Sequence, residues 1–199
     1  MKILDPMKQA YILKFAMIAL LSLGGVGAVG GGFFLTRAFN NKKETSIVVN
    51  TSNYQDIRHN TWSNQTQINH FPAIIPSVAK DARVIFYPGS PEYGRIFQLR
   101  MKLPQQQIKK ALNKYRNTAK HKFQGGDTND HANQENGVPT TFLYTNDLQA
   151  ESFPSTYEIL VLNVNNRSTS DDFSWNHGDS YGVAINSNTS EIVYWAEEW

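Results

Sequence analysis

The stretch YGVAINSNTSEIVYWA, residues 181–196, contains the pattern that decides the fold of this chain. Apolar or aromatic side chains alternate with their neighbours along residues 181–186 and again along residues 191–196, which is typical of two β-strands. Between them lies the short polar run Ser187-Asn188-Thr189. The stretch therefore predicts an antiparallel hairpin.

Further strand-like runs lie at residues 83–87, 94–103, 140–144 and 157–163. The alternation of the second run breaks at Phe97, which predicts either a bulge or a strand buried at one end. About five to six strands around one main amphipathic helix, with hairpin-length connections, predict an α+β fold with a largely antiparallel sheet.

That main helix is expected over residues 105–120, where Pro104 suits its first position. Its apolar side chains recur at helical spacing, at Ile108, Ala111, Leu112 and Tyr115. Lys120 and Lys122 would favour the helix dipole near its end, and Gly125-Gly126 is expected to end it.

Residues 15–36, FAMIALLSLGGVGAVGGGFFLT, run for 22 residues without a charge. As a helix they would span about 33 Å, which matches a hydrocarbon core of about 30 Å. We prefer a single-pass anchor to a cleaved signal peptide, for which Ala28-Val29-Gly30 offers a cleavage point, because the apolar run continues beyond it. A buried soluble helix is the third alternative, and its glycines argue against it.

One face of the expected anchor carries only small residues, namely Gly24, Gly27, Ala28, Gly31 and Gly32. Such a face permits close packing on another transmembrane protein or on a second copy, although glycine-rich anchors also occur without a partner. Lysine and arginine flank both ends equally, so the positive-inside rule leaves the orientation open. A short N-terminal tail favours a domain on the non-cytoplasmic side.

The chain thus divides into a tail (1–14), a transmembrane helix (15–39), a polar tether (40–79) and an α+β domain (80–199). The tether is predicted because residues 40–72 are rich in Asn, Thr, Ser and Gln and show no sustained period.

Charge is segregated along the chain, although its net value is only +2. Residues 80–122 hold eleven Lys/Arg and two Asp/Glu, whereas residues 123–199 hold one Lys/Arg and twelve Asp/Glu. Such asymmetry marks either a nucleic-acid or membrane surface, or two halves that complement each other on folding, which we favour. The absence of cysteine excludes disulfides, thiolate metal sites and cysteine nucleophiles.

Four basic residues of the expected main helix lie off its apolar stripe, namely Lys109, Lys110, Lys114 and Arg116. They would contact anionic lipid headgroups or an acidic partner, or else form an ordinary solvated face. Nucleic acid is not expected as a partner, because neither a binding motif nor basic–aromatic interleaving is present.

Polar functional groups are densest at residues 171–180, where Asp171, Asp172, His177 and Asp179 could hold a cation or perform acid–base work. An ordered loop capped by Asp and Asn is the favoured alternative.

Two further motifs match their patterns only in part. Residues 178–182 fit G-x-S-x-G, but a strand follows the serine and no histidine lies beyond His177. Residues 126–138 begin like a calcium loop but carry Ala132 and Val138 where glycine and glutamate are needed. No metal and no cofactor are predicted.

Several segments together resemble uncharacterised cyanobacterial proteins with an N-terminal membrane anchor: FQLRMKLP (97–104), NGVPTT (136–141), WNHG (175–178), YGVAI (181–185) and IVYWAE (192–197). The resemblance implies a plasma or thylakoid membrane and brings no activity with it.

The sequence therefore predicts a single-pass membrane-anchored accessory or binding protein, whose domain contacts a membrane partner or an anionic surface. The alternative is a membrane-anchored hydrolase that uses the 171–180 loop, with a histidine from His121 or His131.

Overall fold

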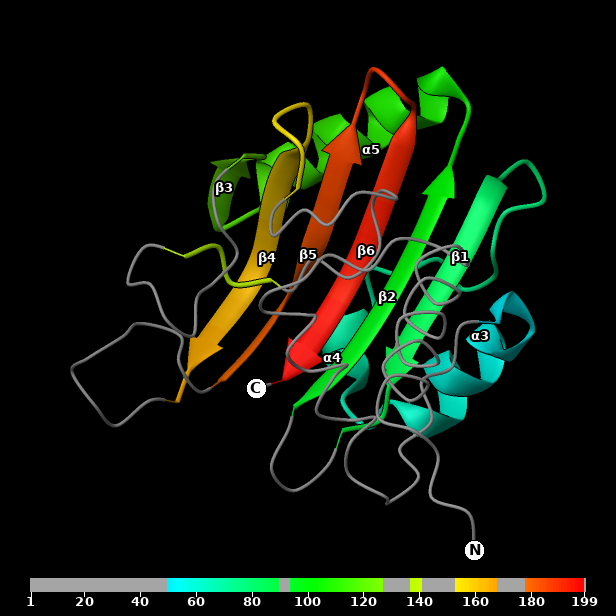
Figure 1. The fold of residues 1–199 in the computed structure, drawn as a ribbon, viewed down its shortest axis with the longest axis vertical. Coiled ribbons are helices and arrows are strands. Elements are labelled where there is room, and N and C mark those ends of the chain that lie inside the picture. The colour runs from blue at the N-terminus through cyan, green and yellow to red at the C-terminus, as the bar shows by residue number, and fades with distance from the viewer. Residues whose placement is uncertain (1–49, 90–93, 127–136, 141–152, 168–177, 199) are drawn as a thin grey trace, which may run out of the picture.

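The fold is α+β and is built on one six-stranded antiparallel sheet (Figure 1). It is seen in a computed structural model, which describes residues 50–89, 94–126, 137–140, 153–167 and 178–198. The strands are β1 (Lys80–Tyr87), β2 (Arg95–Lys102), β3 (His121–Gln124), β4 (Glu158–Asn166), β5 (Gly178–Asn186) and β6 (Glu191–Glu198). Their order across the sheet is β1-β2-β6-β5-β4-β3.

The hairpin predicted from residues 181–196 is confirmed as β5 and β6, and it forms the middle of this sheet. The Asn186 carboxamide oxygen accepts hydrogen bonds from the amides of Asn188 (3.0 Å) and Thr189 (3.3 Å) and so stabilises the turn. Ser190 completes the turn with a φ of 57°.

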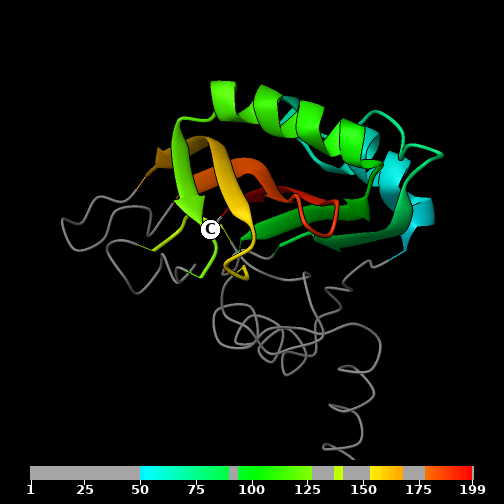
Figure 2. The same ribbon diagram turned by 90° about the horizontal axis from the view of Figure 1, so that it is seen from above.

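Helices cover one face of the sheet (Figure 2). The long helix is α5 (Gln105–Thr118), and the shorter turns are η1 (Thr51–Asn53), α3 (Tyr54–Asp56), η2 (Ile57–Thr61) and α4 (Gln65–Ile68). Ile108 and Tyr115 of α5 are buried, and Ala111 and Leu112 pack beside them, so the predicted apolar stripe is confirmed.

Both faces of the sheet bury apolar side chains, because successive residues of a strand point to opposite sides. On β6, Ile192 and Tyr194 face the helices, whereas Val193 and Trp195 belong to a second cluster on the other face. That second cluster also includes Tyr157.

The predicted strands at 83–87, 94–103 and 157–163 correspond to β1, β2 and β4. Strand β2 pairs in continuous register with β6 and is buried from Ile96 to Leu99, so Phe97 marks a strand buried at one end. Register irregularities lie instead in β1, between Lys80 and Arg83, and in β4, between Val161 and Asn163. The strand expected at 140–144 lies outside the described residues except for Thr140, which is not in a strand.

The helix expected over residues 105–120 is confirmed to within two residues, but the prediction that Gly125-Gly126 ends it is wrong. The helix ends at Thr118, and Ala119 is already extended. The amide of Lys120 then donates to the carbonyl of Val161, and β3 pairs with β4, so sheet pairing takes over from the helix. Lys122, expected near the helix end, lies on β3.

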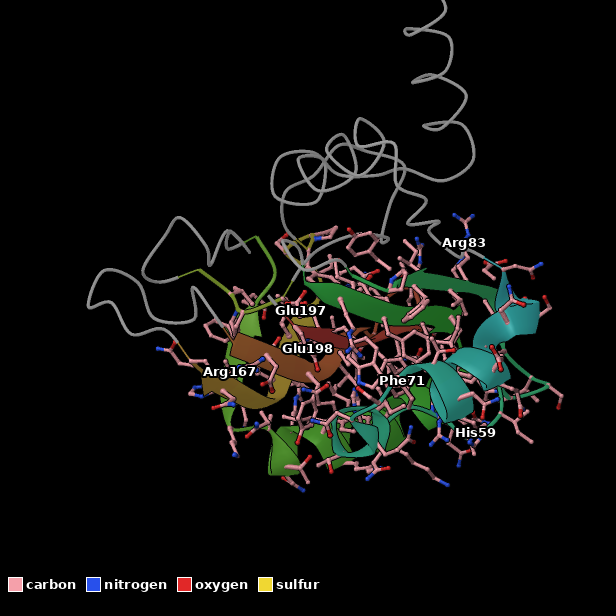
Figure 3. All side chains as sticks on the ribbon, turned by 90° about the horizontal axis from the view of Figure 1, so that it is seen from below. His59, Phe71, Arg83, Arg167, Glu197 and Glu198 are labelled. Carbon is pink, nitrogen blue, oxygen red and sulfur yellow. The ribbon has the colours of Figure 1, made fainter. Side chains whose placement is uncertain are left out.

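The prediction of a polar tether is wrong over residues 51–71, which pack on the sheet. Tyr54, Trp62 and Phe71 are at most 2% exposed, and the rings of Phe71 and Phe97 stack with centroids 4.7 Å apart. Figure 3 shows Phe71 between this segment and the sheet, with His59 on the outer side. Apolar residues that are widely spaced in a polar sequence bury their side chains here, while most of the polar residues between them, Gln67 excepted, stay at least partly exposed.

Among the described residues, no helix is both long and apolar enough to cross a bilayer. The anchor predicted at 15–39 and its small-residue face lie outside those residues.

Candidate interaction surface

Helix α5 presents to solvent a polar face that carries several lysines and no acidic residue. None of its residues is acidic, and Lys109, Lys110 and Lys114 are all exposed. With the apolar stripe turned to the sheet, these three lysines project from the outer surface of the helix. We call them the α5 lysines.

The α5 lysines carry uncompensated charge. Within the described part of the chain none of the three forms an ion pair, and the only close partner is the ring of Tyr115, which the ammonium of Lys114 approaches to 4.9 Å. Lys110 and Lys114 are one helical turn apart, and like charges at this spacing destabilise a helix by about 0.2–0.5 kcal/mol. An anionic partner would remove this cost.

Arg116, the fourth predicted interaction residue, has a different role. Its guanidinium donates two-pronged hydrogen bonds to the Glu158 carboxylate at 2.5–2.9 Å and so joins α5 to β4. These hydrogen bonds raise the pKa of Arg116. The side chain therefore serves the fold, unlike the three lysines, which form no ion pair with other described residues.

The polar loop at 171–180 is described only at its end. Asp171, Asp172 and His177 lie outside the described residues. Asp179 belongs to β5, where it contacts Arg167 (3.4 Å) and Asn165 (3.3 Å). The carboxylate is thus engaged with its own neighbours in the sheet.

The G-x-S-x-G run is part of strand β5 and does not form a nucleophile elbow, which requires a turn into a helix. Ser180 is fully buried and donates to the carbonyl of Pro139. The glycines have a packing reason, since a Cβ at Gly182 would lie 2.3 Å from the carbonyl oxygen of Leu160 and 2.6 Å from the Trp195 ring. This serine is therefore a buried structural group.

The histidines proposed for the hydrolase alternative are not brought to that serine among the described residues. His121 is exposed on the edge strand β3, and His131 lies outside the described residues. No group of three or more His, Asp or Glu within the described ranges is placed to hold a metal ion.

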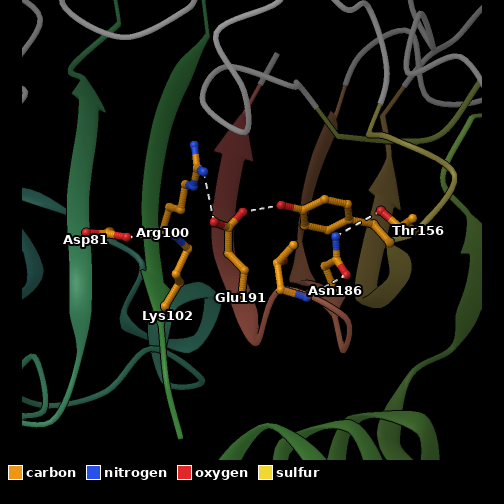
Figure 4. A network of polar contacts seen from close by, with 8 residues as sticks. Asp81, Arg100, Lys102, Thr156, Asn186 and Glu191 are labelled. Carbon is orange, nitrogen blue, oxygen red and sulfur yellow. Dashed lines mark hydrogen bonds and ion pairs between the residues drawn. The ribbon is translucent and has the colours of Figure 1, made fainter. Parts of the chain in front are cut away.

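A buried polar network that the sequence analysis missed lies on the face of the sheet away from the helices (Figure 4). The Glu191 carboxylate, 3% exposed, accepts from the Arg100 guanidinium at 2.8 Å and from the Tyr157 hydroxyl. Beside it, the Asn186 amide donates to the hydroxyl of Thr156 at 2.8 Å. Burial raises the pKa of Tyr157, and the hydrogen bond to Glu191 raises it further.

The alternation of residues along β2 contains a sequence signal for this network. Arg100 alternates with Leu99 and Met101 and therefore lies on the face opposite to the helices. Nothing in the spacing reveals which carboxylate meets it, because Glu191 is 91 positions away in the chain.

A second group missed by the sequence analysis is His70, which lies beneath α5. Its Nε2 donates to the carbonyl of Gly182 at 2.9 Å, and its ring stacks on Tyr181 at a centroid distance of 5.4 Å. Nδ1 has no solvent contact and receives no hydrogen bond of good geometry from the described residues. Burial lowers the pKa of His70 to about 3, and the nearby charge of Lys114 contributes in the same direction.

Comparison with known proteins finds no matching family model, no similar curated protein and no similar solved structure. Among the described residues, the exposed lysines of helix α5 are the strongest candidate for an interaction surface, and no catalytic group is brought to them.

Proposed function

We propose that the chain is a single-pass membrane-anchored accessory or binding protein, whose α5 lysines dock its domain on an anionic surface. The observation that carries this proposal is the set of three exposed lysines with no ion pair within the described part of the chain.

Energetics favours such docking for a domain held near a membrane. Each lysine near an anionic bilayer contributes about 1 kcal/mol. The attraction decays over roughly 10 Å at 0.1 M salt, so a lone cationic helix would bind weakly from solution. The proposed anchor at 15–39 would hold the domain within reach and raise the effective concentration of the helix at the surface.

The test uses the full chain in proteoliposomes. Because an anchored chain stays with the vesicle whether or not its domain docks, docking is measured by the position of a fluorophore relative to the lipid headgroups. The chain has no cysteine, so Asn113→Cys places one fluorophore on the exposed face of α5. Gln55→Cys on the exposed side of α3 gives a matched control. A nitroxide on lipid headgroups should quench the fluorophore at 113 in anionic vesicles, and high salt should relieve the quenching.

Charge reversal at Lys110 sharpens the test. Lys110→Glu changes the local charge by two units, which should cost docking about 2 kcal/mol and lower the docked-to-undocked ratio about thirtyfold. The same change creates a favourable i,i+4 pair with Lys114, worth about 0.2–0.5 kcal/mol to the helix. Lost quenching therefore cannot be ascribed to an unfolded helix. Equal quenching at 113 in neutral and anionic vesicles would contradict the proposal.

A further inference from the structure

The connection between α4 and β1 carries an unusual pair of exposed apolar side chains. Ile74 is 67% exposed and Val78 is 48% exposed, and these are the large apolar residues that the described part of the chain leaves open to solvent. Ile75 and Ala79 of the same connection pack against the core, so the segment is held in place on the domain. We call Ile74 and Val78 the apolar pair.

The apolar pair lies at the same corner of the molecule as the beginning of α5. Strand register places Lys80 opposite Lys102. Val78 precedes Lys80 by two residues, and Pro104, which caps α5, follows Lys102 by two residues. Figures 1 and 2 both draw this connection near the end of the sheet where α5 begins.

The surroundings of the apolar pair are cationic. Lys80 is exposed next to it, and Lys109 and Lys110 occupy the first turns of α5. None of these three lysines forms an ion pair within the described ranges. Lys102 differs, because its ammonium donates to Asp81 at 2.7 Å.

We propose that this corner is a membrane-docking site for anionic lipid, in which Ile74 and Val78 enter the headgroup boundary while the lysines contact lipid phosphates. The inference rests on the proposed function and names both its partner and a second contact. Apolar side chains beside lysines are the combination that interfacial membrane binding uses. Protein–protein interfaces are by contrast depleted in lysine and enriched in aromatic residues and arginine.

The two contacts have separable signatures. Lysine–phosphate attraction weakens with salt, whereas burial of apolar surface does not. Docking should therefore retain a salt-resistant part as long as the apolar pair is present. Ile74→Ser combined with Val78→Ser should abolish that part and lower the docked-to-undocked ratio about tenfold. Both positions are exposed in the fold, so these changes leave the core intact.

The experiment places single cysteines at Ile74, at Val78 and, as control, at Gln55 of the full chain in proteoliposomes. Each carries a polarity-sensitive fluorophore, and a nitroxide is placed at a shallow acyl position of the lipid. Vesicles of phosphatidylglycerol and of phosphatidylcholine are compared. We expect quenching and a blue shift at positions 74 and 78 in phosphatidylglycerol alone, and no change at 55.

The outcomes distinguish this inference from the proposed function. Headgroup quenching at position 113 without acyl-chain quenching at 74 and 78 overturns the insertion of the apolar pair and leaves docking through α5 standing. Equal acyl quenching in both lipids overturns the requirement for anionic headgroups. No quenching at any of these positions overturns both proposals.

Discussion

At the scale of single residues, His70 shows how burial sets protonation. A histidine in water has a pKa near 6.5. Packed beneath α5 against Tyr181 and hydrogen-bonded through Nε2 to Gly182, its pKa falls to about 3. The charged group facing it is Lys114, which opposes protonation. The ring is therefore neutral in the folded protein at physiological pH.

This depressed pKa predicts a loss of stability in acid. The unfolded chain binds the proton below pH 6.5, whereas the folded chain resists it until about pH 3. The contribution of His70 to the free energy of unfolding is therefore complete above pH 6.5. Below that pH it falls by about 1.4 kcal/mol per pH unit, so that about 2–3 kcal/mol has been lost at pH 4.5. Urea unfolding of the detergent-solubilised chain, followed by fluorescence of buried Trp62 and Trp195, measures it.

The control is His70→Gln, whose amide retains a donor for the Gly182 carbonyl and does not titrate. Carboxylates contribute to the acid response of both proteins, so the difference between them isolates His70. Parallel loss of stability in the two proteins between pH 7 and pH 4.5 would contradict the assignment.

At the scale of elements, the segment from η1 to α4 is the part that departs most from expectation. Its helices are each at most five residues long, so they have little stability of their own. Trp62 holds the segment on the sheet because its indole ring contacts the rings of Phe86 and Phe97, at centroid distances of 6.5 Å and 6.2 Å. Its indole N–H also donates to the Gln67 carboxamide at 3.0 Å.

Replacing Trp62 should therefore destabilise the whole domain. We expect Trp62→Ala to lower the free energy of unfolding by about 3–5 kcal/mol, because it opens a cavity and leaves the buried Gln67 without its partner. Gln55→Ala, on the exposed side of α3, should change it by less than about 0.5 kcal/mol. Urea unfolding followed by circular dichroism compares them, and equal small effects would mean that the segment is a tether after all.

The elements that the sequence predicted well are those with an unbroken period. The β5–β6 hairpin and the stripe of α5 each place apolar residues at the spacing of their own secondary structure, so local sequence was sufficient. Strand β3 is four residues long, carries little apolar character and exists because β4 is beside it. The candidate surface was predictable to the same extent: the α5 lysines follow from the helix period, but the engagement of Arg116 with Glu158 does not.

At the scale of the whole molecule, the segregated charges meet when the chain folds. Three ion pairs join the basic first half to the acidic second half, namely Arg95–Glu198, Arg100–Glu191 and Arg116–Glu158. The expectation that the halves complement each other is confirmed for these described pairs. The α5 lysines take part in none of these pairs and give the domain a cationic side.

Of these pairs, Arg100–Glu191 should matter most for stability, because both side chains are largely withdrawn from water. Glu191→Gln removes the carboxylate charge that pairs with the Arg100 guanidinium and should cost about 2–4 kcal/mol. Asp81→Asn breaks the exposed pair with Lys102 and should change stability little. Thermal unfolding of both variants checks the order, and equal shifts in the melting temperature would show that burial of the network is unimportant.

The sequence by itself determined the central hairpin, the α+β class and the amphipathic helix with its lysines, because periodicity is a local property that each element carries in its own residues. Only the tertiary structure decided that residues 51–71 belong to the core, that Ser180 is buried, and that Glu191 meets Arg100 and Tyr157. These are contacts between segments far apart in the chain, and their partners are chosen by strand order and by which face each side chain occupies.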